Sequence, residues 1–251
     1  QGIGQDDRHR ILRRTLGGQP GDPRRPARRP LEDRLEISLR TSPGHRYARG
    51  MRLLPALAAL LLACLPAQAM PPPERLAALA RGVNVTHWLR FPPSRAEADI
   101  VNYLRDSDLK ALKEAGFTFI RLPVDPALVA LPDGRLRPEA LRQVEAIVRR
   151  ITAAGLAVMV EPHPVTSTGF DSSQAARQSV FAFWQSLAPV LARFPPEKVF
   201  LELLSEPIFR GKEAEWYAMQ ERLAAELRAA APRHTLVGSG TSWSAIDGLL
   251  P

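Results

Sequence analysis

From residue 82 onward, short apolar runs alternate with longer stretches that have the periodicity of amphipathic helices. The apolar runs cover residues 82–85, 117–122, 156–160, 199–204 and 234–237. Between them, residues 100–115, 138–154, 173–194 and 213–231 carry apolar side chains at helical spacing. Gly116 and Gly155 follow two of these stretches, as glycine commonly follows a helix. The pattern predicts strands that alternate with helices.

Such alternation builds βαβ units, in which successive strands are parallel and the crossovers are right-handed. The expected strands begin 35 to 43 residues apart, which suits either an α/β barrel or a doubly wound sheet. No Gly-x-Gly-x-x-Gly follows the first expected strand, so a dinucleotide-binding sheet is disfavoured. The sequence therefore predicts an α/β fold without a dinucleotide cofactor.

Ionisable and aromatic side chains stand at the expected carboxyl ends of the strands, where parallel barrels carry their reactive groups. They are His87 and Trp88 after the first strand, Arg121 at the end of the second, Glu161 and His163 after the third, Ser205 and Glu206 after the fourth, and Trp243 after the fifth. Each has a structural alternative, such as an internal ion pair, a core histidine or rim packing. Their shared position nevertheless favours one site. Trp184 and Trp216 lie at helical spacing and are expected to pack.

Five stretches of the sequence resemble glycoside hydrolase family 5, the cellulase-type retaining glycosidases of (β/α)8 fold. They are residues 81–88, 108–123, 158–163, 199–207 and 237–243. They occur in the family's order and at its spacing. The resemblance implies a (β/α)8 TIM barrel that hydrolyses β-linked polysaccharide with retention and needs no metal or organic cofactor.

The resemblance also implies roles for matched residues. Glu206 is similar to the family's general acid/base, the proton donor, and Arg121 to the arginine that positions and ionises the nucleophile. His163 resembles the histidine that lines the sugar subsite. A retaining glycosidase needs one protonated carboxyl to donate to the leaving oxygen and one ionised carboxyl, about 5–5.5 Å away, to attack the anomeric carbon.

Four further residues are expected to contact the substrate. Ser205 stands where the family usually has an Asn that contacts the sugar 2-hydroxyl, so a changed rate or substrate preference is expected. His87 lies on the same predicted rim, and the flat rings of Trp88 and Trp243 are suited to stacking on sugar faces. The sequence does not choose among glucan, mannan and exopolysaccharide substrates.

The length of the barrel region falls short of a whole barrel. A complete barrel typically has about 250 residues, and the family's nucleophile is a Glu at the end of the seventh strand. Residues 70–251 hold five expected strands. We therefore expect the N-terminal part of the catalytic domain, truncated after about five β/α units, with the nucleophile outside this sequence. The full-length protein is expected to be a monomer.

The basic charge belongs mainly to the first 50 residues. The chain has a formal net charge of +8, but residues 1–50 hold 12 Arg and 6 acidic residues, whereas the rest is nearly balanced. This distribution disfavours a nucleic-acid partner. The Arg- and Pro-rich composition predicts that residues 1–50 are either untranslated upstream sequence or a disordered basic segment.

Residues 51–69 have the layout of a secretory signal. Met51 and Arg52 precede an apolar stretch of about a dozen residues, and Ala67-Gln68-Ala69 forms a small-residue cleavage site. The stretch is shorter than the roughly 20 residues that span a bilayer. We expect a secreted or periplasmic protein.

Cys64 is the single cysteine of the chain, which excludes intramolecular disulfides and zinc sites built on several thiolates. It follows Leu61-Leu62-Ala63 in a sequence that resembles a lipobox. Lipidation of Cys64 would anchor the protein to a membrane, which is the one membrane contact that the sequence suggests.

Two other functions stay open from the sequence. A non-catalytic relative could keep the cleft and bind carbohydrate without cleaving it. A barrel enzyme of another class could use Glu161, His163, Glu206 and His234 as metal ligands. His234 opens the fifth expected strand, which would place it at the opposite rim from the other three.

Overall fold

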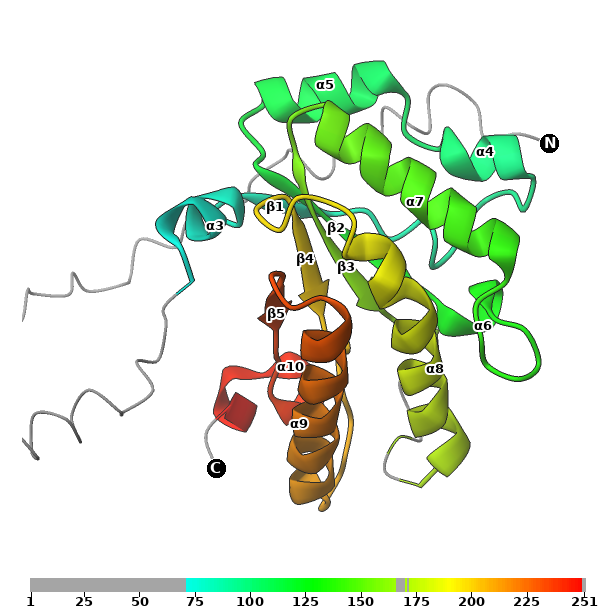
Figure 1. Ribbon diagram of the computed structural model, residues 1–251, viewed down its shortest axis with the longest axis vertical. Helices are drawn as coiled ribbons and strands as arrows, with labels where there is room; N and C mark the ends of the chain where they lie inside the picture. Colours follow the sequence, from blue (N-terminus) through cyan, green and yellow to red (C-terminus); the bar gives the residue numbers. More distant parts are fainter. Residues whose placement is uncertain (1–70, 166–169, 171, 250–251) are drawn as a thin grey trace, which may run out of the picture. The chain divides into compact units, whose positions relative to one another are not determined.

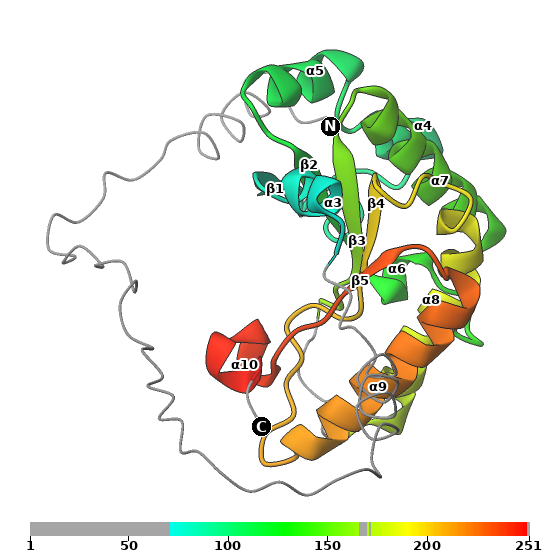
Figure 2. The same cartoon turned by 60° about the vertical axis from the view of Figure 1, so that its left-hand side comes forward.

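The structure, a computed structural model, describes residues 71–165, 170 and 172–249. In these ranges a parallel sheet carries its long helices along one side (Figures 1 and 2). The strands are β1 (Gly82–Asn84), β2 (Phe119–Val124), β3 (Ala157–Pro162), β4 (Val199–Glu202) and β5 (Thr235–Val237). Each strand lies beside its neighbour in the sequence, in the order β1-β2-β3-β4-β5.

All neighbouring strands pair in parallel. The longest pairing joins β2 and β3, from Phe119 opposite Ala157 to Val124 opposite Pro162. A doubly wound sheet would show a reversal of strand order, and these five strands show none. They correspond to successive strands of a (β/α)8 barrel, which confirms the fold class predicted from the sequence.

The helices follow the strands as predicted, with several short additions. They are α3 (Pro73–Ala78), α4 (Glu97–Val101), α5 (Asp106–Glu114), α6 (Pro126–Val129), α7 (Pro138–Ala153), α8 (Gln174–Leu191), α9 (Glu213–Ala230), α10 (Thr241–Ser244) and the 3-10 helix η1 (Ile246–Leu249). The helices α7, α8 and α9 match their expected ranges to within a few residues. The sequence pattern did not predict α3, α6, α10 or η1.

The single helix expected over residues 100–115 is wrong, because the chain forms α4 and α5 with a break between them. Arg150, on α7, stabilises the break. Its guanidinium donates to the carbonyl oxygens of Val101 and Leu104 and pairs with Asp106 at 2.6 Å. Carbonyls at a helix end lack partners within the helix, so these contacts replace the bonds that a continuous helix would make.

The core lies between the sheet and the long helices. Ile120, Leu122 and Val124 alternate along β2 and are fully buried, as are Val144 and Ile147 on α7. Burial of each such side chain contributes about 1.5–3 kcal/mol.

Both tryptophans that were expected to pack do so. Trp184 and Trp216 are buried, and their indole N–H groups donate to the carbonyl oxygens of Leu203 and Ser239 at 2.9 Å. Each ring therefore fixes a helix to the segment that follows a strand, which confirms the packing prediction.

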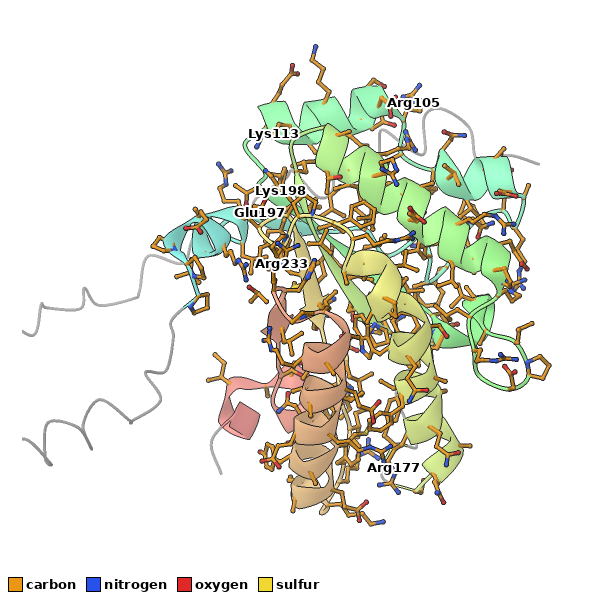
Figure 3. All side chains as sticks on the ribbon, viewed as in Figure 1. Arg105, Lys113, Arg177, Glu197, Lys198 and Arg233 are labelled. Atoms are coloured by element: carbon orange, nitrogen blue, oxygen red, sulfur yellow. The ribbon has the colours of Figure 1, made fainter. Side chains whose placement is uncertain are left out.

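Charged side chains lie near the amino end of the sheet (Figure 3). The strands β2, β4 and β5 are preceded by Lys113, Glu197, Lys198 and Arg233, whereas Arg177 lies in the first turn of α8.

Among the described residues, no helix has both the length and the apolar character that a membrane span requires. The predicted upstream segment (1–50), the signal peptide (51–69) and Cys64 lie outside the described residues.

Candidate active site

Arg121 is the centre of a buried charge network at the carboxyl end of the sheet. Its Nε and Nη2 donate to the two carboxylate oxygens of Glu202 at 2.7 and 2.6 Å. Its Nη1 lies 2.6 Å from Oε1 of Glu161 and donates to Oδ1 of Asn84 at 3.3 Å. Nη2 also contacts the hydroxyl oxygen of Ser205 at 2.8 Å. One guanidinium thus joins β1, β2, β3 and the end of β4.

The alternation of side chains along the strands creates this network. Residues two apart on a strand share a face, so Arg121 points away from Ile120 and Leu122, which pack toward the helices. Because Arg121 contacts Glu161 and Glu202 directly, both carboxylates lie on that same face of the sheet. The face opposite the helices is therefore polar at its carboxyl end.

Burial and charge act in opposite directions on these groups. Burial alone would lower the pKa of Arg121, but the hydrogen bond to Glu202 and the charges of Glu161, Glu202 and Glu206 together raise it. Burial raises the pKa of Glu161, and this effect outweighs the His163 hydrogen bond and the Arg121 charge, which act to lower it. Arg121 therefore remains a cation in a partly desolvated position.

His163 bridges the buried network and the accessible carboxyl of Glu206. Its Nδ1 lies 3.1 Å from Oε1 of Glu161, and its Nε2 lies 3.3 Å from Oε2 of Glu206. The backbone N–H of His163 donates to the carbonyl of Val124 at 2.7 Å, which fixes the residue just beyond β3. The ring is almost fully buried.

Glu206 opens into a cavity of about 310 Å³. Its side chain is 42% exposed. Arg121, Glu202, Ser205 and Trp243 also line the cavity, together with the glycine-rich segment 238–240. Trp243 is 54% exposed, and the Arg210 guanidinium carbon lies 5.8 Å from its ring centroid. An accessible carboxyl and an exposed indole ring therefore share one cavity wall.

Gly240 fixes the path of this wall. A Cβ atom at Gly240 would lie 2.4 Å from the backbone carbon of Gly248. Because backbone atoms cannot move aside cheaply, a side chain at position 240 would force the 3-10 helix η1 away from α10, which contains Trp243.

The structure brings together five of the residues predicted from the sequence, namely Arg121, His163, Ser205, Glu206 and Trp243. Ser205 is only 1% exposed, and its hydroxyl contacts Arg121. Its main contact is therefore with the guanidinium, although the residue also forms part of the cavity wall.

The expectation that Trp88 stacks on a sugar is wrong. Its ring is fully buried, its indole N–H donates to the carbonyl of Ile100 at 2.7 Å, and it packs near the ring of Tyr103. His87 is exposed, and its Nδ1 lies 3.3 Å from the carbonyl oxygen of Phe91. It is not among the residues that line the cavity.

Sequence reasoning missed Glu202 and Asn84, both of which contact Arg121. Glu202 carried a usable signal, because it lies inside the apolar run 199–204. A carboxylate in a buried strand needs a charged or hydrogen-bonding partner. Asn84 gave no comparable signal in the sequence.

The four residues considered as metal ligands do not come together in the structure. Within the described ranges, no three His, Cys, Asp or Glu side chains are grouped in a way that could hold a metal ion. His234 directly precedes β5, at the amino end of the sheet. Glu161, His163 and Glu206 lie at the opposite end.

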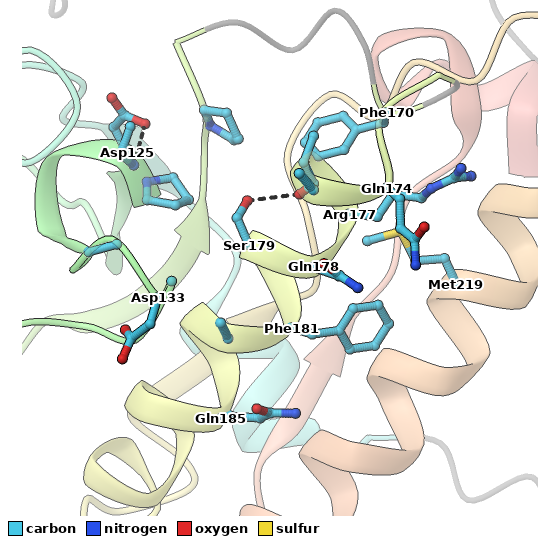
Figure 4. Close-up of a pocket in the computed structure, with 18 of the residues that line it drawn as sticks. Asp125, Asp133, Phe170, Gln174, Arg177, Gln178, Ser179, Phe181, Gln185 and Met219 are labelled. Carbon is cyan, nitrogen blue, oxygen red and sulfur yellow. Dashed lines mark hydrogen bonds between the residues drawn. The ribbon is translucent and has the colours of Figure 1, made fainter.

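A larger cavity, of about 1040 Å³, lies on the helix side of the sheet, among α6, α8 and α9 (Figure 4). Phe170, Phe181 and Met219 line part of it, with the amides of Gln174 and Gln178. The residues of the Arg121 network do not line it. The chemistry predicted from the sequence therefore belongs to the smaller cavity.

Residues 86–249 match the family described as cellulase (glycosyl hydrolase family 5). The chain belongs to this family. Cellodextrinase A of Ruminococcus flavefaciens is 22% identical over 164 residues, which are 61% of this chain and 48% of that protein. Endoglucanase 3 of Fibrobacter succinogenes is 25% identical over 187 residues, which are 67% of this chain and 28% of that protein.

Thermotoga maritima Cel5A, solved with cellobiose, has a similar fold, with a TM-score of 0.61 and 24% identity over 71% of this chain and 57% of that one. The same protein has been solved with mannotriose. At this identity the likeness shows the fold alone. The chain spans about half the length of Cellodextrinase A and of Cel5A, and a smaller share of Endoglucanase 3.

Proposed function

We propose that this protein is a glycoside hydrolase that cleaves β-linked glycans with retention, and that Glu206 is its proton donor. The observation that carries the proposal is the position of Glu206 in a cellulase-family chain. Its carboxyl is accessible in a cavity, contacts His163 and lies beside the partly buried cation Arg121. Proton donation needs such a carboxyl at the reacting bond.

Retention requires a second carboxyl, ionised and about 5–5.5 Å from the acid. Glu161 and Glu202 are both bound by Arg121 and are almost fully buried. We propose neither as the nucleophile. The positive charge of Arg121 would favour the ionised form of any carboxylate brought to the cavity beside it.

For the substrate, we propose β-linked gluco- or manno-oligosaccharides. Trp243 supports this choice, because an exposed indole ring at a cavity wall provides a flat apolar surface for a sugar. The similarity to a cellodextrinase and to a Cel5A solved with cellobiose and with mannotriose agrees with it. The proposed reaction needs no metal or organic cofactor, and we propose a monomer as the full-length form.

The test is Glu206→Gln in the full-length protein. We expect hydrolysis of cello- or manno-oligosaccharides to fall by roughly 10²–10⁴-fold, the usual contribution of general acid–base catalysis, while calorimetry still detects substrate binding. Glu221→Gln, at an exposed position on α9, is the matched control and should leave hydrolysis unchanged. Binding without hydrolysis by the unaltered protein would instead support the non-catalytic relative.

We also propose that the protein is exported to the periplasm or the medium. The proposal rests on the sequence of residues 51–69, with a lipid anchor at Cys64 as the alternative. Cell fractionation, with N-terminal sequencing of the mature chain, separates the two. A chain that begins at or near position 70 supports cleavage after the Ala67-Gln68-Ala69 segment, whereas one that begins at a modified Cys64 supports the anchor.

A further inference from the structure

His163 contacts two carboxylates whose surroundings differ. Oε1 of Glu161 lies 2.6 Å from Nη1 of Arg121, and a guanidinium can only donate. Oε1 is therefore an acceptor. Any proton on Glu161 would lie on Oε2, which is buried and has no hydrogen-bond partner among the described residues. It follows that Nδ1 of His163, 3.1 Å from Oε1, carries a hydrogen and donates it.

The other ring nitrogen then determines what His163 can do. Nε2 lies 3.3 Å from Oε2 of Glu206, and a hydrogen bond there requires one proton between the two atoms. Either Glu206 is protonated and donates to Nε2, or Nε2 is protonated and donates to the carboxylate. A pair without this proton would place the imidazole lone pair against a negative oxygen.

We infer that His163, oriented by Glu161, retains on the His163–Glu206 pair the proton that Glu206 delivers to the leaving oxygen. The inference rests on the proposed function of Glu206. In these roles Glu161 and His163 are positioning residues, because they act through Glu206 and not on the sugar.

The proton balance closes over the two steps of a retaining reaction. An enzyme carboxylate bonds to the anomeric carbon while the bond to the leaving oxygen breaks. The pair's proton passes to that oxygen, which leaves Glu206 ionised opposite a neutral His163. Water then attacks the anomeric carbon, the bond from that carbon to the enzyme carboxylate breaks, and the proton of the water passes to Glu206, which restores the pair.

The surrounding charges favour retention of the proton. Arg121 on β2 faces the pair with one positive charge, whereas Glu161 on β3 and Glu202 on β4 bring two carboxylates. Asp125, after β2, also interacts electrostatically with His163 and with Arg90. A negative field disfavours loss of a proton from a neighbouring group, and Glu161 is the carboxylate in direct contact with the ring.

The test compares two variants of the full-length protein by the pH dependence of kcat/KM. Glu161→Gln removes the charge that touches His163, so we expect the alkaline limb to move to lower pH by about one pH unit or more. Glu202→Gln is the matched control. This substitution removes a buried carboxylate that Arg121 binds but that does not contact His163. We therefore expect the alkaline limb to move clearly less than in Glu161→Gln.

A second comparison uses the leaving group. A dinitrophenyl β-glycoside releases an anion that needs no proton, whereas an oligosaccharide does need one. Glu161→Gln should therefore lose at least tenfold more activity on cello- or manno-oligosaccharides than on the matching dinitrophenyl glycoside. Equal losses on both substrates, or equal movement of the limb in both variants, would overturn the inference.

Nitrogen NMR of the ¹⁵N-histidine-labelled protein provides a readout that does not need turnover. We expect Nδ1 of His163 to carry the hydrogen in the unaltered protein, and a bare Nδ1 overturns the inference even if Glu161→Gln fails to fold. If the unaltered protein hydrolyses no β-glycan, the proposed function fails, and the NMR result still decides the orientation of His163.

Discussion

Two histidines of the described ranges are buried, His163 and His234, and they lie at opposite ends of the same sheet. His163, after β3, has a carboxylate near each ring nitrogen. Both ring nitrogens of His234, before β5, lack a hydrogen-bond partner of normal geometry within the described part of the chain. Its charged neighbours include Arg75 and Arg233.

The difference shows how the environment selects the charge state. Burial lowers the pKa of His234, and the positive charges of Arg75 and Arg233 act in the same direction, so the ring is buried as a neutral group. At the other end, His163 lies among carboxylates and Arg121, where buried charges are kept by pairing. The amino end of the sheet thus buries His234 as a neutral ring, whereas the carboxyl end keeps buried charges by pairing them.

The largest expected effect comes from removing the cation that pairs the carboxylates. Arg121→Met leaves Glu161 and Glu202 buried without their main partner, and we expect a loss of about 3–5 kcal/mol in the free energy of unfolding. Urea denaturation measures it. The exposed pair of Arg135 with Asp133 provides the control, because Arg135→Met should change stability far less. An unaltered urea midpoint for Arg121→Met would show that the network is not stabilised by its pairing.

The next effect is a pH dependence that should differ in sign between the two ends. The pKa of His234 is lower in the folded chain than its unfolded value of about 6.5, so the unfolded chain binds more protons below that pH, and acidification destabilises the fold. Glu161 has a raised pKa, so its contribution to stability is present at low pH and is lost as pH rises through that raised value.

The substitution His234→Leu tests how much His234, at the amino end of the sheet, contributes to this pH dependence. We expect its stability to depend less on pH between 7 and 5 than that of the unaltered protein, as measured by urea midpoints at a series of pH values. His87→Leu, at an exposed position, should leave the dependence as it is. If His234→Leu loses stability on acidification as steeply as the unaltered protein, another group is responsible.

The smallest effect tests how much the network depends on its one hydroxyl. Ser205→Ala removes the contact between the serine hydroxyl and Nη2 of Arg121. Arg121 keeps its two carboxylates, so we expect a loss of about 0.5–1.5 kcal/mol. The urea midpoint measures it, and a loss as large as that of Arg121→Met would mean that Ser205 is as important as the ion pairs.

The sequence pattern predicted the helices and strands that are determined by their own local sequence. The apolar runs and helical periodicity located β2, β3, α7 and α9 to within a few residues. The break between α4 and α5 did not follow, because Arg150, more than 40 residues further along the chain, binds the carbonyls there. Contacts of that kind cannot be read from a local window.

The candidate site likewise contains residues whose place the sequence predicted and residues whose place it did not. Strand-end position and family resemblance identified Arg121, His163 and Glu206, which the structure places in contact or in one network. Trp88 lies at the expected position after a strand, but its ring is buried and donates to the carbonyl of Ile100 on α4. Side-chain direction after a strand depends on the path of the loop, which the sequence pattern does not specify.

The backbone at Glu206 has φ of 50°, in the left-handed region that glycine adopts freely and other residues adopt at a cost of about 1–2 kcal/mol. Glycine at this position would relax the chain but would remove the carboxyl that we propose as the acid, whereas glutamate provides that carboxyl and keeps the chain strained. Selection for a more stable protein and selection for a working carboxyl would therefore favour different residues at position 206.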